Sequence, residues 1–271
     1  MKQEARRKNL PGKIWDVLYP TAALVLCMLI VTMAALMLAG WITGKQSADS
    51  RELMEAVPGL SLWVSGGFYG AALLTQRKQY ALDALQFDEP EKRWRAKKTA
   101  AACFLAAALG HLLSTGMEYS GFMELFPGYS RQAAAAFEGQ NLLLLIAATV
   151  VLGPAAEEMI FRGMTYRRAR SYAGPLWGAL ISSLLFGLYH GNMVQFVYSF
   201  LIGLLFAAIC QNSGGILASA AAHSAANLWA IFSTPVFGWL QGLSPAGAPA
   251  GLALEGALVC VCGWILLRKR P

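Results

Sequence analysis

Long runs of apolar residues dominate the chain, and short polar segments separate them. A transmembrane helix needs about 20 mostly apolar residues, and eight stretches approach that length. They are residues 19–42, 57–75, 99–116, 141–166, 175–190, 195–210, 214–232 and 250–267. The pattern predicts an all-α polytopic membrane bundle of about eight transmembrane helices, built as a single integral membrane domain over residues 1–271.

Two details refine this prediction. The first apolar run, from Tyr19 to Ile42, is longer than the core of a signal peptide, so we expect a retained transmembrane helix. Gly191, Asn192 and Met193 form the only turn between the fifth and sixth stretches, which predicts a tight helical hairpin at that point.

Composition and charge support the membrane prediction. Hydrophobic residues make up 56% of the chain and charged residues only 14%, which argues against a water-soluble fold of this length. Nineteen of the 22 Lys and Arg residues lie in four segments: the N-terminus, 76–98, 162–174 and the C-terminus. Eight spans place these segments on one face, and the positive-inside rule makes that face cytoplasmic.

The excess of seven positive charges therefore flanks membrane spans, and no separate basic helix remains to bind nucleic acid. We expect a multi-pass membrane protein with both termini in the cytoplasm, located in the plasma membrane if the source is bacterial. Membrane lipid is an expected partner, and nucleic acid is excluded.

Ionisable residues inside apolar segments are costly, so each is a functional candidate. Glu157 and Glu158 follow the apolar stretch of the fourth segment and point about 100° apart on a helix. Glu158 and Arg162 have the i, i+4 spacing of an intrahelical ion pair. That pairing leaves Glu157 as the free carboxylate of the segment.

Two further polar pairs lie in later segments. Phe186 and His190 share one face of the fifth predicted helix, as do His223 and Asn227 of the seventh. At about 1.5 Å per residue, Glu157 lies about 15 Å, His223 about 13 Å and His190 about 22 Å from the cytoplasmic end of its helix. With tilt they can meet at mid-depth, where a cytoplasm-facing cavity would have to hydrate them.

Three motifs therefore follow one another, each in its own apolar segment. They read Glu157-Glu158-x-x-x-Arg162, Phe186-x-x-x-His190 and His223-x-x-x-Asn227. Their order and spacing resemble the CPBP family of intramembrane proteases, also called the Abi family, which includes the type II CAAX prenyl endopeptidases. The resemblance covers about residues 141–232, which we take as the catalytic core.

The resemblance implies an endopeptidase that cleaves a membrane-associated or prenylated peptide or protein. It assigns Glu157 to the activation of water and His190 to holding that water. It assigns His223 and Asn227 to the oxyanion. Glu158, Arg162 and Phe186 are expected to support these four catalytic residues.

The metal requirement is left open by the residues. Glu157, His190 and His223 would be the ligands if the reaction needs a divalent ion such as zinc, as the family's metalloprotease label implies. The chain has no His-Glu-x-x-His sequence, in which one helix supplies two ligands and a base. We favour a reaction without metal and commit to no cofactor.

Two other functions remain alternatives: a catalytically idle scaffold or immunity-type protein of the same fold, and a proton-coupled transporter with a protonatable Glu and His pair. A transporter built from repeats predicts matching features in both halves, whereas the motifs lie only in the second half. Outside the motifs, we expect His111 to be a packed or hydrated residue of the third span. Glu255 is expected to be an interfacial acid near the outer end of the eighth.

The charge distribution predicts the topology. Reporter fusions after residues 12, 90, 172 and 271 should report cytoplasm, and fusions after residues 48, 128 and 243 should report the opposite side. A non-cytoplasmic signal at 90 or 172 would contradict the number of spans and the orientation of the bundle.

Overall fold

The computed structural model describes residues 9–45, 49–89, 94–129 and 139–268, and this part of the chain is helical without any strand. A helix lies at each of the eight predicted segments. Seven are α2 (Leu10–Thr43), α4 (Leu60–Phe87), α5 (Ala96–Tyr119), α10 (Pro175–Tyr189), α11 (Met193–Ser213), α12 (Leu217–Leu243) and α13 (Gly247–Leu267). The eighth is a continuous rod formed by α7 (Leu142–Leu145), η3 (Ile146–Leu152), α8 (Gly153–Glu157), η4 (Glu158–Tyr166) and α9 (Arg167–Ala173). Two short elements, α3 (Ser50–Ala56) and η2 (Met123–Leu125), lie between the long helices.

The prediction of a helical membrane bundle is confirmed, whereas the predicted number of eight spans is not. In the described residues, five helices are long and apolar enough to cross a membrane: α2, α5, the rod, α11 and α13. Helix α10 is apolar but has only 15 residues, short of the length that a perpendicular span needs. Helices α4 and α12 are long but are not among the five.

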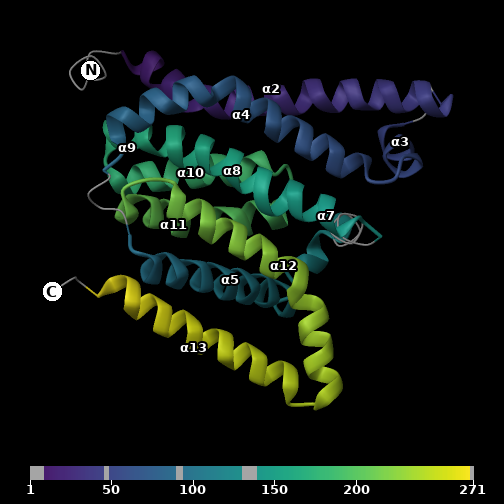
Figure 1. Cartoon of the computed structure of the whole chain (residues 1–271), viewed down its shortest axis with the longest axis vertical. Coiled ribbons are helices and arrows are strands. Elements are labelled where there is room, and N and C mark those ends of the chain that lie inside the picture. Colours follow the sequence, from purple (N-terminus) through teal and green to yellow (C-terminus); the bar gives the residue numbers. More distant parts are fainter. Residues whose placement is uncertain (1–8, 46–48, 90–93, 130–138, 269–271) are drawn as a thin grey trace.

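The helices form a bundle with the rod at its centre (Figure 1). Helices α2 and α4 lie along one edge, and α5 and α13 lie along the opposite edge. The rod, α10, α11 and α12 fill the space between these edges. The beginning of α2 and the end of α13 lie at the same end of the molecule, as an even number of crossings would place them.

The basic segments at 76–98 and 162–174 are more ordered than the sequence suggested. Helix α4 continues to Phe87, and α9 extends the rod to Ala173, so much of both segments is helical. Arg168 is buried and binds Asp83 through two hydrogen bonds, Nε to Oδ2 at 2.7 Å and Nη2 to Oδ1 at 3.1 Å. A buried cation needs such a partner, and this ion pair fixes α4 against the end of the rod.

The rod contains two π-helical stretches, η3 and η4, in which backbone bonds span five residues. The Gly153 N–H, for example, bonds the Ala148 carbonyl. Pro154 comes next and has no N–H, so the Thr149 carbonyl loses the donor that the same pattern would supply. Such stretches are rare and often lie at functional sites.

The predicted hairpin between α10 and α11 is confirmed. Gly191 has a φ of +71°, a conformation that favours glycine, and the Asn192 side chain accepts the Gln195 N–H at 2.8 Å to cap α11. The two helices approach closely at Gly187, where an added Cβ would lie 2.8 Å from the Phe196 carbonyl oxygen. The hairpin therefore requires glycine at position 187.

The variant Gly187→Ala tests this packing. The new methyl group must push α11 away, so we expect the free energy of unfolding to fall by about 1–3 kcal/mol. The matched control is Gly70→Ala in α4, where nothing lies within 4 Å of the added Cβ and alanine favours the helix. Thermal unfolding of the purified proteins would measure both effects, and equal melting temperatures for the two variants would contradict the close approach.

Candidate active site

The pair formed by Glu158 and Arg162 is the most buried part of the site. Arg162 Nη1 lies 2.8 Å from Glu158 Oε1, and both side chains are 0% exposed, which confirms the predicted ion pair. Arg162 Nη2 also donates to the Gly203 carbonyl of α11 at 3.1 Å. The guanidinium lies over the rings of Phe186 and Phe206, 4.4 Å and 5.2 Å from their centroids. The arginine is therefore held by α10 and α11 as well as by its own helix.

His223 of α12 lies between the two glutamates. Its Nδ1 is 3.1 Å from Glu158 Oε1, and its Nε2 is 3.5 Å from Glu157 Oε2. The imidazole stacks on Phe206 at 4.6 Å and meets the edge of Phe186 at 5.7 Å. Although adjacent glutamates diverge on a helix, one histidine thus contacts both of them.

Glu157 is not a free carboxylate, and the prediction on this point is wrong. The Tyr69 hydroxyl of α4 donates to Glu157 Oε1 at 2.6 Å, and the Tyr189 hydroxyl lies 3.4 Å from that of Tyr69. The i, i+4 rule covers partners on the same helix only, so it missed a donor from another helix. A lone tyrosine within the apolar stretch 57–75 was the available signal.

His190 directly follows α10 as its C-cap and faces the same aromatic ring as His223. Its Nδ1 is 2.7 Å from the Phe186 carbonyl, and its Nε2 is 3.5 Å from the Ser199 hydroxyl. The Phe186 ring meets the His190 ring edge-on at 5.0 Å. The two residues therefore share a face as predicted, and the Phe186 ring contacts both imidazoles.

Asn227 lies one turn after His223 on α12 and binds the irregular backbone of the rod. Its Nδ2 donates to the Thr149 carbonyl at 2.8 Å. This is the carbonyl that Pro154 leaves without a helical donor, so the amide satisfies a backbone acceptor that would otherwise be unpaired. One amide hydrogen and the Oδ1 atom of Asn227 remain for other partners.

The structure thus brings the three motifs together from the rod, α10 and α12. Glu157 and His223 are 4% and 5% exposed, so little solvent reaches them. Within the described ranges, no group of three or more His, Cys, Asp or Glu side chains has an arrangement that could hold a metal ion. The proposed ligand set of Glu157, His190 and His223 is not among such groups.

His111 and Glu255 form a second buried cluster, away from the motifs. Glu255 of α13 is 5% exposed, and its carboxylate meets His111 Nδ1 at 2.8 Å and Trp229 Nε1 at 2.7 Å. The expectation of an interfacial acid is therefore wrong, because α5 and α12 cover this face of α13. His111 is a packed residue, as expected, and the cluster joins three helices.

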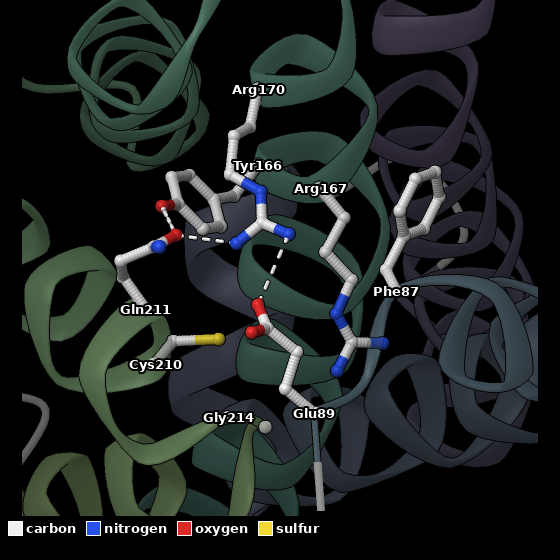
Figure 2. Close-up of a pocket in the computed structure, with 9 residues that line it drawn as sticks. Phe87, Glu89, Tyr166, Arg167, Arg170, Cys210, Gln211 and Gly214 are labelled. Carbon is white, nitrogen blue, oxygen red and sulfur yellow. Dashed lines mark hydrogen bonds and ion pairs between the residues drawn. The ribbon is translucent and has the colours of Figure 1, made fainter. Parts of the chain in front are cut away.

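A small polar pocket lies where η4 and α9 meet the end of α11 (Figure 2). Arg170 points toward Glu89 at 3.7 Å, and both Arg170 and Tyr166 bond the Gln211 side chain at 2.5 Å. Its volume of about 10 Å³ suits a single water molecule. The remaining lining residues are Phe87, Arg167, Cys210, Gly214 and Gly215.

A larger pocket of about 570 Å³ lies between the beginnings of α4 and α7, lined by residues that include Gly59, Trp63 and Leu144. None of the motif side chains lines either pocket. The cytoplasm-facing cavity that would hydrate the motifs therefore stays a prediction.

Comparison with known proteins yields one match. Residues 139–229 match a family model described as "Type II CAAX prenyl endopeptidase Rce1-like". Neither the curated proteins nor the solved structures give a match. The matched region contains all three motifs but leaves out α2, α4, α5 and α13. Over residues 139–229, the chain is therefore similar to the Rce1-like family of type II CAAX prenyl endopeptidases, in agreement with the resemblance that its three motifs show.

Proposed function

We propose that the protein is an intramembrane endopeptidase that hydrolyses a peptide bond in a membrane-associated or lipid-anchored substrate. The observation that carries the proposal is the buried contact between Glu157 Oε2 and His223 Nε2 at 3.5 Å, inside the region that matches the family. A carboxylate and imidazoles in a site with little solvent are groups that amide hydrolysis can use.

In this mechanism Glu157 is the general base. It takes a proton from a water molecule as the water attacks the scissile carbonyl, and it then gives a proton to the leaving amine. His190 directly follows α10 and lies beside the same Phe186 ring that His223 contacts, so its Nε2 can help to hold the water. No metal takes part in any of these steps.

The oxyanion needs hydrogen-bond donors that are already in place. His223 in its imidazolium form donates at both nitrogens, Nδ1 to Glu158 and Nε2 to the oxyanion. The second amide hydrogen of Asn227 is a further donor, because the first is bound to Thr149. Glu158 and Arg162 act indirectly, since they hold His223 in position.

The position of the motifs in the helical bundle indicates the class of substrate. The first motif lies in the rod, which is long and apolar enough to cross a membrane, and α10 and α12 carry the other two beside it, so a substrate must reach them from the membrane or its surface. The family match adds a preference for a prenylated peptide with its cleavage site near the C-terminus. We therefore propose prenylated or membrane-inserted peptides as the substrate class, with membrane lipid as the surrounding partner.

The first test separates the two glutamates. Glu157→Gln should lower kcat by about a hundred- to ten-thousand-fold through loss of the base, with normal amounts of folded protein. Glu158→Gln should mainly lower the folded yield, because it leaves Arg162 buried without its counter-charge. The matched control is Glu118→Gln, an exposed position in α5 that should change neither. Cleavage of a prenylated peptide by purified protein measures kcat, and a fully active Glu157→Gln variant would refute the assignment.

The second test concerns metal. Purified active protein should contain less than one metal ion per chain, and activity should survive prolonged chelation. His223→Ala should lower kcat by about a hundred- to a thousand-fold through loss of an oxyanion donor, with the metal content unchanged. Stoichiometric zinc that is lost in His223→Ala would instead establish a metalloprotease and leave the hydrolase proposal intact.

A further inference from the structure

Tyr69 reaches the proposed base from α4, outside the region that matches the family. Its hydroxyl donates to Glu157 Oε1 at 2.6 Å in a partly buried setting. We infer that Tyr69 is a positioning residue that fixes the Glu157 carboxylate, so that Oε2 is the oxygen that accepts the proton from water. The inference rests on the proposed function, because it assigns a task to one residue of that site.

The two oxygens of Glu157 face different helices. Tyr69 of α4 occupies Oε1, whereas His223 of α12 faces Oε2 at 3.5 Å. A hydrogen bond from a phenol to an ionised carboxylate is stronger than one between neutral groups. It therefore restricts rotation of the carboxylate about its terminal bond. Oε2 then stays on the side of His223, where the water and the scissile carbonyl must lie.

The Tyr189 hydroxyl orients Tyr69 in turn. It donates to the Tyr69 oxygen at 3.4 Å, which directs the Tyr69 hydrogen toward Glu157. Tyr189 is the last residue of α10 and directly precedes His190, so the same helix end orients Tyr69 and carries the histidine proposed to hold the water. The longer distance makes this second bond the weaker of the two.

Gly153 makes room for the Tyr69 ring. It lies four residues before Glu157 on the rod, and a Cβ at this position would lie 3.3 Å from Tyr69 Cε2. The ring also packs on Phe68, with centroids 4.4 Å apart. The phenol therefore lies across the face of the rod that carries Glu157, and Gly153 permits its close approach.

Two further contacts set the position of α4 along the rod. An added Cβ at Gly163 would lie 2.8 Å from the Tyr80 ring, and Arg168 binds Asp83 beyond it. Tyr69, Tyr80 and Asp83 thus meet the rod at successively later positions, in the same order along both helices. This fixed register brings the Tyr69 hydroxyl level with Glu157.

The variant Tyr69→Phe tests the inference, because it removes the hydroxyl and keeps the ring. We expect kcat to fall about ten- to a hundred-fold, the range for loss of a hydrogen bond to a charged group. KM should stay within about two-fold, since the residue acts through the base and does not bind substrate. The melting temperature should stay close to that of the wild type.

The matched control is Tyr198→Phe, which removes another partly buried phenol hydroxyl, packed against Gly110. It should retain the wild-type kcat. A Tyr69→Phe variant with the wild-type kcat would overturn the inference. So would an equal loss of activity in both variants that follows a loss of folded protein, because that result would show a packing role only.

A second variant moves the phenol without removing it. Gly153→Ala should push the ring away from Glu157 and lower kcat, and the double variant with Tyr69→Phe should be no slower than Tyr69→Phe alone. Fully additive losses would show that Gly153 does not act through the hydroxyl, and would contradict this route of positioning.

Infrared spectroscopy tests the hydrogen bond without activity. The carboxylate band of Glu157, identified by its loss in Glu157→Gln, should shift in Tyr69→Phe and stay in place in Tyr198→Phe. A shifted band in a protein without peptidase activity would refute the proposed function and leave the contact standing. An unshifted band together with an unchanged kcat would refute the positioning role in an active protease.

Discussion

The buried ion pair between Glu158 and Arg162 is the constraint on which the site depends. Two fully buried charges lose their hydration, and this loss is offset only where further polar groups and good geometry surround them. Gly203 of α11 and His223 of α12 supply those polar groups, and Phe186 of α10 covers the guanidinium. The contacts that stabilise this ion pair therefore hold three helices, α10, α11 and α12, against the rod. They also place His223 beside Glu157.

The irregular backbone of the rod makes a second contribution. The π-helical stretch ending at Leu152, followed by Pro154, leaves the Thr149 carbonyl without a helical donor, and Asn227 takes that place. The cost of an unpaired carbonyl in a membrane interior makes this contact strongly favoured. It fixes α12 against the rod one turn beyond His223, so a local defect in one helix sets the position of another.

The site also depends on a helix outside the matched region. Helix α4 runs in the same direction as the rod and is fixed at one end by the Arg168 and Asp83 ion pair. Farther along, Tyr69 meets Glu157. A polar cluster elsewhere, formed by His111, Glu255 and Trp229, joins α13 to the other edge of the bundle without contributing to the motifs.

The sequence by itself determined the features that depend on neighbours a few residues apart. Apolar runs indicated each long helix, the spacing of Glu158 and Arg162 indicated their ion pair, and Gly191 indicated the hairpin. Only the tertiary structure decided which distant groups meet. Tyr69 and Glu157 are 88 positions apart, and Asn227 and Thr149 are 78 apart. Contacts of this kind depend on how each helix is rotated and shifted against its neighbours, and helical periodicity within one segment carries no information on that rotation.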